Sequence, residues 1–172
     1  MSRGWKAGMM FVENKFDQND YFVICAVLVS WGIYFFLPKV FSKQLTILIF
    51  LYSLTAAGLF DNSIGAEPFD FYDIMDGPEY TVMDVVVYFL YPPFSYLFLY
   101  LYKKYQIKDR YLVFFIASFT AAAIAIEWVF YIMGVFHYKN GNSIKYSVCT
   151  YLFIQSLIIV FYRFLRTNKQ ET

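Results

Sequence analysis

Five long apolar runs, separated by short polar connections, dominate the pattern of residues along the chain. Each run approaches the length that a helix needs to cross a bilayer core of ~30 Å, although the first two are at the short end of that range. The pattern predicts an all-α, polytopic integral membrane helical bundle of about five transmembrane helices. The spans are expected near residues 21–37, 44–60, 82–102, 111–133 and 146–165. No internal repeat appears, so residues 21–165 form one transmembrane bundle in this prediction, with tails at 1–20 and 166–172.

The tail that precedes the first apolar run has a helical pattern of its own. One helical face would carry Trp5, Met9, Val12 and Phe16, at i, i+4, i+7 and i+11. An amphipathic helix that lies in the membrane interface has this pattern. A frayed terminus is the alternative.

Composition favours a bilayer over water as the solvent of this chain. Hydrophobic residues make up 60% of the sequence and charged residues 16%, whereas a soluble domain has about 25% charged residues. The net charge is +1 and no basic cluster of the kind that binds a nucleic-acid backbone is present, which argues against a nucleic-acid partner. Cys25 and Cys149 form no Cys-x-x-Cys pair, so we expect them to behave as small hydrophobes. No motif calls for a cofactor.

The positions of lysine and arginine predict the orientation of the spans. Basic residues cluster in three segments, which contain Lys39, Lys43, Lys103, Lys104, Lys108, Arg110, Arg163, Arg166 and Lys169. The connection of residues 61–81 contains none. Cytoplasmic connections carry the excess of basic residues in membrane proteins. Five spans in the cell membrane, with the N-terminus outside and a cytoplasmic C-terminal tail, satisfy all three segments, although Arg3, Lys6 and Lys15 would then lie outside.

The connection of residues 61–81 is strongly acidic. Its acids are Asp61, Glu67, Asp70, Asp73, Asp76 and Glu79. Carboxylates bind hard cations, which makes Asp70, Asp73 and Asp76 weak candidates for a metal site. Their spacing of three does not match the alternating acids of an EF-hand loop, so we expect no metal. Asp76-Gly-Pro-Glu79 instead has the pattern of a helix start, with an N-cap, a proline in the first turn and an acid at N3.

Two acids lie within the expected spans, where a charged side chain costs at least ~2.5 kcal/mol. Asp84 is near the start of the third span and Glu127 is deeper in the fourth, so both fall in the outer half of the predicted bundle. They are the candidate catalytic residues. Asp84 also fits a capping box with Thr81, which is the alternative role. A polar stripe that should face other helices contains Asp84, Tyr88, Tyr91 and Ser95.

Glu127 belongs to a second polar face. That face of the fourth span carries Thr120, Ala123, Glu127, Tyr131 and Gly134. A hydrogen bond from Glu127 to a tyrosine, or to Gln155 of the fifth span, would make a purely structural clamp, which is the alternative to a functional role. His137 is the single histidine. It is a possible proton partner for Glu127, but we favour an interfacial side chain in a loop.

Consecutive prolines interrupt the third span. Pro92 and Pro93 have no N–H groups, which frees the carbonyls of Tyr88 and Phe89 and predicts a kink. Irregular backbone at membrane depth is tolerated beside protein or a water-filled cavity. We therefore expect a ligand-binding cavity beside the kink, with a kink that serves only packing as the alternative. The expected binding residues are Tyr88, Tyr91, Pro92, Pro93, Ser95, Glu127, Trp128, Tyr131, Tyr151 and Gln155.

Several motifs occur together, and in order, over roughly residues 55–163. They are FDFYDIMD, YPPFSYLFLYLY, IEWVFYIMGVFHY and YSVCTYLF, preceded by Asp61. Through its Tyr-Pro-Pro and Glu-Trp elements the chain resembles a family of short multi-spanning membrane proteins found chiefly in endospore-forming bacteria. Ser95 stands where the family pattern has Asn, and Thr150-Tyr151-Leu152 lacks an expected proline. The resemblance implies a helical membrane protein and supplies no reaction.

Three functions agree with these residues. The one we favour is a membrane protein that binds a lipid, a small molecule or a protein partner in a polar seam in the outer half of the bundle. The second is an intramembrane enzyme that acts on a lipid or isoprenoid, with Glu127 as proton donor. The third is a proton- or cation-coupled transporter, oligomeric because five spans contain no repeat. The expected partners are membrane lipids, a lipid-like ligand, and a second copy or another membrane protein.

Overall fold

The computed structural model describes residues 16–75 and 81–168, and helices make up most of this part of the chain. The elements are α1 (Gln18–Phe36), α2 (Lys43–Ser63), β1 (Tyr72–Ile74), α3 (Val82–Tyr88), α4 (Tyr91–Lys104), α5 (Asp109–Ile132), β2 (Phe136–Tyr138) and α6 (Ile144–Asn168). α3 and α4 together make one span, so the described residues contain five helical spans that are long and apolar enough to cross a membrane. The predicted bundle of about five helical spans is therefore confirmed.

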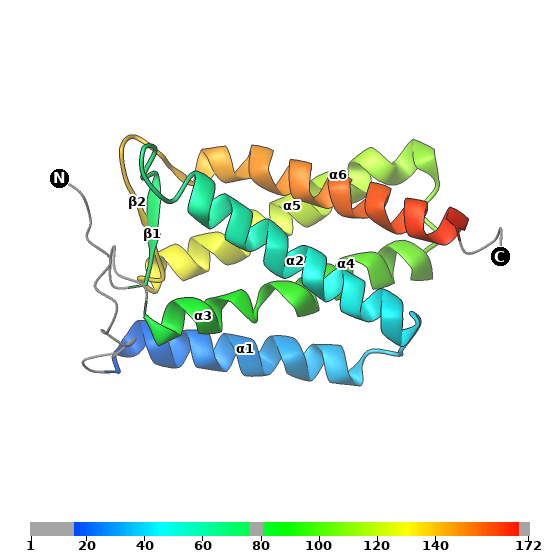
Figure 1. Ribbon diagram of the computed structural model, residues 1–172, viewed down its shortest axis with the longest axis horizontal. Helices are drawn as coiled ribbons and strands as arrows, with labels where there is room; N and C mark the ends of the chain where they lie inside the picture. The colour runs from blue at the N-terminus through cyan, green and yellow to red at the C-terminus, as the bar shows by residue number, and fades with distance from the viewer. Residues whose placement is uncertain (1–15, 76–80, 169–172) are drawn as a thin grey trace.

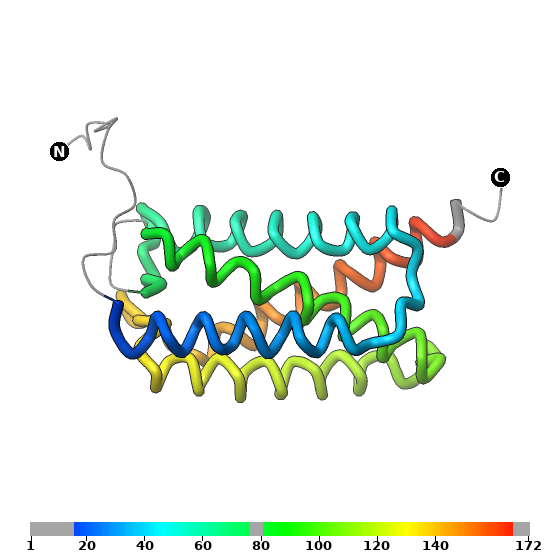
Figure 2. The backbone as a smooth tube through the Cα atoms, turned by 90° about the horizontal axis from the view of Figure 1, so that it is seen from below, coloured from blue at the N-terminus to red at the C-terminus, as the bar shows by residue number. Residues whose placement is uncertain are grey.

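The spans lie side by side, and the two short strands lie at one end of the bundle (Figure 1). α1 packs against α3 and α4, α2 packs against α4, and α5 packs against α6. The connection from α1 to α2 and that from α4 to α5 lie at the end opposite the strands (Figure 2). We call the end with these two connections the basic end of the bundle, and the end with the two strands the strand end.

Side-chain caps explain where the first spans begin. Asp17 accepts a hydrogen bond from the Asn19 N–H, and Asp20 accepts one from the Asp17 N–H, so a capping box starts α1. α1 therefore begins a few residues before its expected start. Ser42 caps α2 in a simpler way. Of the proposed amphipathic tail, Trp5, Met9 and Val12 lie outside the described residues.

The third span is broken where the prolines predict. α3 ends at Tyr88 and α4 starts at Tyr91, with Pro92 and Pro93 in its first turn. The carbonyl of Phe89 accepts a hydrogen bond from the Trp31 indole nitrogen at 2.9 Å. A side chain of α1 therefore satisfies one of the two carbonyls that the prolines free from the helix.

The strands form a small sheet that the sequence analysis does not predict. β1 and β2 pair antiparallel, and Tyr72 lies opposite Tyr138 in the register. Backbone hydrogen bonds from Met75 to Val135 and from Lys139 to Phe71 extend the pairing at each end. Because side chains of residues directly opposite each other in neighbouring strands lie on the same face, Tyr72 and Tyr138 share a face of this sheet.

The basic segments meet at the end of the bundle opposite the sheet. The Lys103 ammonium donates to the Val40 carbonyl at 2.6 Å and so ties α4 to the connection between α1 and α2. The Arg163 guanidinium reaches from α6 to Tyr102 and to the Asp109 carboxylate at 2.5 Å. These contacts bring together the three segments whose lysines and arginines predict a common side of the membrane.

Two groups of buried side chains fill the bundle unequally. Toward the basic end, buried residues of α2, α4, α5 and α6 pack together, among them Ile49, Leu99, Ile116 and Ile159. At the strand end the buried group draws on α1, α3, α5 and the strands, including Val23, Val87, Phe130 and Val135. In the described part of the chain, that second group contains no buried side chain of α2 or α6. The space between those helices at the strand end is thus left for a cavity.

Large apolar side chains cover the outside of the helices. Exposed examples occur on every span, among them Leu28, Phe36, Leu59, Val113, Phe114 and Val160. Such a surface suits contact with lipid tails, which require no hydrogen bonds from the side chains that they touch. Cys25 and Cys149 are both free and exposed.

Candidate functional site

A cavity of about 700 Å³ lies between α2, α4, α5 and α6, toward the strand end. Small residues make room for it, with Ala56 and Ala57 on α2 and Ala122 and Ala123 on α5. Its walls are mainly apolar, and they include Phe60, Leu90, Phe94, Phe98, Phe119, Ile126, Ile154 and Ile158. A volume of this size falls within the range of small-molecule sites in proteins.

Glu127 lies in the wall of this cavity, on α5, and only 6% of the residue is exposed. Its Oε1 accepts hydrogen bonds from the Tyr138 hydroxyl and from the Ser147 hydroxyl, the latter at 2.5 Å. Its Oε2 is buried and has no hydrogen bond of standard geometry among the described residues. The Tyr151 phenol interacts with the same carboxyl group. The partners of Glu127 thus come from β2 and α6.

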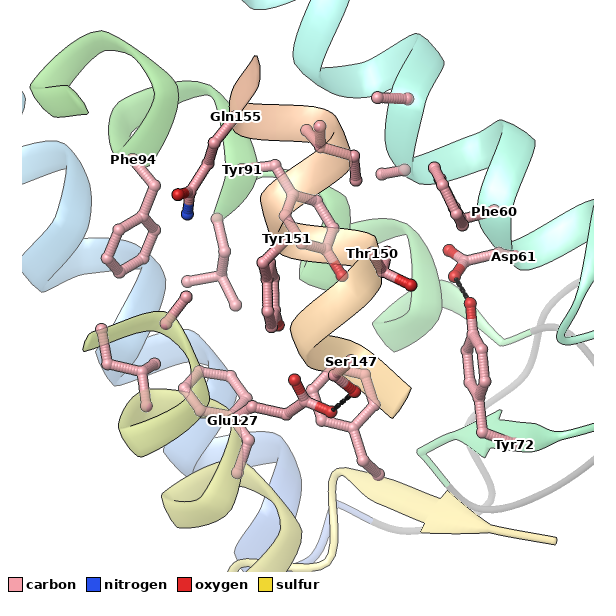
Figure 3. Close-up of a pocket in the computed structure, with 18 of the residues that line it drawn as sticks. Phe60, Asp61, Tyr72, Tyr91, Phe94, Glu127, Ser147, Thr150, Tyr151 and Gln155 are labelled. Atoms are coloured by element: carbon pink, nitrogen blue, oxygen red, sulfur yellow. Dashed lines mark hydrogen bonds between the residues drawn. The ribbon is translucent and has the colours of Figure 1, made fainter. Parts of the chain in front are cut away.

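Asp61 supplies a second carboxyl group from the last turn of α2, and 8% of it is exposed. Its Oδ1 accepts a hydrogen bond from the Tyr72 hydroxyl at 2.5 Å. Its Oδ2 is buried and, like Glu127 Oε2, makes no hydrogen bond of standard geometry within the described part of the chain. Tyr88 also interacts with this carboxyl group. Figure 3 shows Asp61 on α2 and Glu127 on α5 at different sides of the cavity, together with the Tyr91 phenol, which interacts with both carboxyl groups.

The small sheet places a phenol on each carboxyl group. Tyr72 donates to Asp61 and its cross-strand partner Tyr138 donates to Glu127. Burial raises the pKa of both phenols, and the neighbouring carboxyl group raises each pKa further. Both hydroxyls therefore keep their protons and remain donors at physiological pH. The sheet fixes two donors at the strand end of the cavity.

Tyr91 connects the two acids electrostatically. It is the first residue of α4, so the break before the prolines sets the direction of its side chain. The phenol interacts with the carboxyl groups of both Asp61 and Glu127, and its hydroxyl points into the space between α6 and α2 (Figure 3). The proline-broken span thus contributes a polar group to the cavity.

Of the two partners considered for a clamp at Glu127, a tyrosine or Gln155, the structure shows a tyrosine. Gln155 accepts a hydrogen bond from the Thr120 hydroxyl at 3.0 Å, deeper in the bundle. Glu127 is hydrogen-bonded to a tyrosine, but that tyrosine lies on β2 rather than within a span. The two polar contacts between α5 and the following segments are therefore separate.

The structure divides the expected binding residues into two sets. Those that line the cavity are Tyr91, Ser95, Glu127, Tyr151 and Gln155. Those outside its lining are Tyr88, Pro92, Pro93, Trp128 and Tyr131. Trp128 and Tyr131 lie on the outer face of α5, where they are 57% and 48% exposed. The two prolines are buried in helix packing and set the break rather than the lining.

Asp84 forms the capping box with Thr81 at the start of α3 that was the alternative to a catalytic role. Its Oδ2 accepts from the Thr81 N–H at 2.5 Å, and the Asp84 N–H donates to the Thr81 hydroxyl. Both halves of the capping box are present. Asp84 is buried but does not line the cavity. Asp61, rather than Asp84, is the acid that shares the cavity with Glu127.

Several polar residues of the lining are absent from the predicted site, and four of them form the hydrogen bonds at the two carboxyl groups. These four are Asp61, Tyr72, Tyr138 and Ser147. Asp61 falls at the end of a span, and Tyr72 and Tyr138 lie in connections that the apolar pattern leaves unassigned. The one available signal is that Tyr72, Tyr138 and Ser147 lie within the sequence motifs on which the proposed family resemblance rests.

Lys139 pairs with the acids that were weak metal candidates. Its ammonium forms an ion pair with Asp73 and lies 3.7 Å from Asp70. Asp76 lies outside the described residues. Among the residues that are described, no three histidine, cysteine or acidic side chains gather as a metal site.

His137 lies on the face of β2 opposite Tyr138 and is exposed. Its Nε2 is 2.9 Å from the Gly134 carbonyl oxygen. The hydroxyl of Tyr138, rather than His137, reaches Glu127.

The chain was compared with protein-family models, with curated proteins and with solved structures, and none of the three comparisons gives a match.

Proposed function

We propose that this protein is a multi-pass protein of the cell membrane that binds an amphipathic, lipid-like ligand in the cavity between α2, α4, α5 and α6. The observation that carries the proposal is a cavity of about 700 Å³ with apolar walls and two buried carboxyl groups at one end. Orientation from the basic segments would place that end on the outer side of the membrane.

The division of the lining supports a ligand with two chemically different parts. Apolar side chains such as Phe94, Phe98 and Ile154 line the deeper part. The polar groups of Asp61, Glu127 and the tyrosines gather at the strand end. A hydrocarbon part would exclude water from the deep walls, and a polar head would meet the unfilled carboxyl oxygens.

Native mass spectrometry of the protein released from its own membrane tests this proposal. Wild type should retain a bound amphipathic molecule through detergent exchange. Ala123→Phe places a ring in the cavity wall and should abolish retention. Ala121→Phe is the matched control because Ala121 is exposed on the same helix, outside the lining. Equal retention by wild type and Ala123→Phe would contradict the proposal.

The pair of acids favours an intramembrane enzyme as a second candidate. Asp61 and Glu127 line one cavity, and Tyr91 interacts with both. General acid–base chemistry needs two such groups on either side of a substrate. The lipid compositions of cells that express wild type and of cells that express Glu127→Gln distinguish the enzyme from the binding protein. An enzyme converts its substrate only in wild type, whereas a binding protein leaves the lipid composition of both kinds of cells the same.

A further inference from the structure

The polar end of the cavity carries two acidic side chains and, among the described residues of its lining, no basic side chain to pair with them. Of the described residues that line it, Asp61 and Glu127 are the acids, and none is lysine, arginine or histidine. More than nine-tenths of each acidic residue is buried. Buried carboxylates in proteins are normally paired with a cation or a metal. The charge that would balance this pair is missing from the described lining.

The hydrogen bonds to these carboxyl groups do not supply that charge. Tyr72, Tyr138 and Ser147 donate through hydroxyls, which carry no net charge. They also engage only one oxygen of each group. Oδ2 of Asp61 and Oε2 of Glu127 are buried without a hydrogen bond of standard geometry among the described residues. Apart from the interactions with the uncharged phenols of Tyr88 and Tyr151, one oxygen of each acid is therefore left as an acceptor for a group that enters the cavity.

Aromatic rings surround the same region. The cavity is lined by Tyr72, Tyr91, Tyr138 and Tyr151, and Figure 3 shows Tyr91 and Tyr151 beside α6 between the two acids. Ring faces attract alkylammonium groups, and the attraction grows when the cation is desolvated. Carboxylates combined with tyrosine rings are the groups that an ammonium ion would need in place of water.

The walls limit which cations fit. A bare metal ion would leave the apolar surface of Phe60, Phe94 and Phe98 uncovered. A phospholipid head group would bring a phosphate next to two carboxyl groups, and like charges in contact are unfavourable. A cation with an apolar body satisfies both parts of the lining.

We propose that the cavity binds amphipathic organic cations, with an amine or quaternary ammonium group between Asp61 and Glu127 and the apolar body against the walls. This inference rests on the proposed function and adds the chemical class of the ligand. One positive charge placed between the two acids interacts with both, so each acid contributes to affinity.

Three probes with the same dodecyl chain test the head-group class. They are dodecyltrimethylammonium, dodecanol and dodecylphosphocholine, which are cationic, neutral and zwitterionic. Radiolabelled dodecyltrimethylammonium is bound to the full chain in phosphatidylcholine nanodiscs, and binding to empty nanodiscs is subtracted. We expect saturable binding that the unlabelled cation displaces and that the other two probes displace at least about thirtyfold less effectively, the least expected from a buried charge contact.

Charge-neutralising variants locate the binding. Asp61→Asn and Glu127→Gln should each weaken binding of the cation by at least about thirtyfold, since each removes one partner of a buried charge contact. Asp109→Asn makes the same change at the basic end, where the carboxylate is exposed and pairs with Arg163. Its affinity should equal that of wild type. If a cavity variant does not fold, the ranking of the three probes on wild type still shows whether the cavity selects a cationic head group.

The outcomes separate this inference from the function on which it rests. If dodecanol or dodecylphosphocholine displaces the label as well as the cation does, and Ala123→Phe abolishes that binding, the cavity binds amphipathic molecules but does not select cations. The inference then fails and the proposed function stands. If no probe binds saturably, or Ala123→Phe leaves binding unchanged, both fail.

Discussion

At the scale of the residue, Glu127 depends on a single hydroxyl from outside the helices. Tyr138 on β2 and Ser147 on α6 share its Oε1, while Oε2 has no such contact among the described residues. When a buried carboxyl group loses a hydrogen-bond donor, part of its desolvation penalty is no longer offset, and the folded state is less stable. The stability of the strand end should therefore be sensitive to the removal of one oxygen atom.

Tyr138→Phe is predicted to lower the free energy of unfolding by about 1–3 kcal/mol, because Glu127 loses a buried donor. Thermal or denaturant unfolding in a mild detergent, followed by circular dichroism, measures the change. Tyr146→Phe is the matched control because Tyr146 is exposed and removal of its hydroxyl should have little effect. Equal stability of Tyr138→Phe and wild type would show that the hydrogen bond is not needed.

A second prediction concerns the break between α3 and α4. Trp31→Phe removes the donor to the Phe89 carbonyl and should destabilise the protein by about 1 kcal/mol beyond the loss of ring size. Trp128→Phe makes the same substitution at an exposed position of α5. If both variants unfold at the same temperature as wild type, another group satisfies the carbonyl at the break.

Sequence reasoning finds some of these residues and misses others for a physical reason. Glu127 and Tyr91 stand out because an acid and a pair of prolines are conspicuous inside apolar runs. Asp61 and Tyr72 do not, because the position of Tyr72 depends on its pairing with Tyr138, which lies far along the chain. A local pattern holds no information about such a distant pairing.

At the scale of the element, caps and breaks determine where the helices begin and end. The short sheet determines which phenols reach the two carboxyl groups of the cavity. The apolar runs predict every span because a helix that crosses a bilayer needs about 20 mostly apolar residues. The third run has that length although its helix is broken before the prolines. Thr81 and Asp84 show that short capping patterns are as informative here as in soluble proteins. The strands are three residues each, so they leave no alternating pattern that could be recognised.

The ion pair beside the sheet gives a prediction with a direction in pH. The contact with Asp73, opposed by a smaller desolvation effect, raises the pKa of Lys139 above its ordinary value of 10.5. A raised pKa in the folded state means that the ion pair contributes fully below the ordinary pKa. That contribution is lost as the pH rises through the raised value.

Lys139→Met removes this contact at neutral pH. The amide of Met75, which pairs with Val135 beside the strands, should then exchange its hydrogen faster than in wild type. Lys145→Met is the control, since Lys145 is an exposed lysine at the same end of the bundle. Hydrogen exchange followed by mass spectrometry measures both variants, and unchanged exchange would show that backbone pairing alone holds the sheet.

At the scale of the whole molecule, the basic side chains between the spans and the polar end of the cavity lie at opposite ends of the bundle. Lys103 and Arg163 make their contacts at the basic end, while Asp61 and Glu127 lie toward the strands. Because basic connections stay in the cytoplasm, the cavity should have its polar end toward the outside. The chain direction alternates from span to span, so one labelled site at each end settles the orientation.

Single cysteines report which end is outside. In a Cys25→Ser, Cys149→Ser background, Phe69→Cys marks the strand end and Tyr105→Cys marks the basic end, both at exposed positions. A membrane-impermeant maleimide applied to intact cells should label the first variant and not the second. Labelling of Tyr105→Cys alone would reverse the proposed orientation and place the polar end of the cavity in the cytoplasm.

The pairing of β1 with β2 also determines when the site can form during synthesis. The segment that contains Asp61 and Tyr72 emerges from the ribosome well before the strand at residues 136–138. Three spans, therefore, have to enter the membrane before the fourth brings Glu127 and its adjoining strand into place. Until then Tyr72 has no cross-strand partner, and the donor to Glu127 has not been translated. The polar end of the cavity is consequently among the last parts of the fold to be completed.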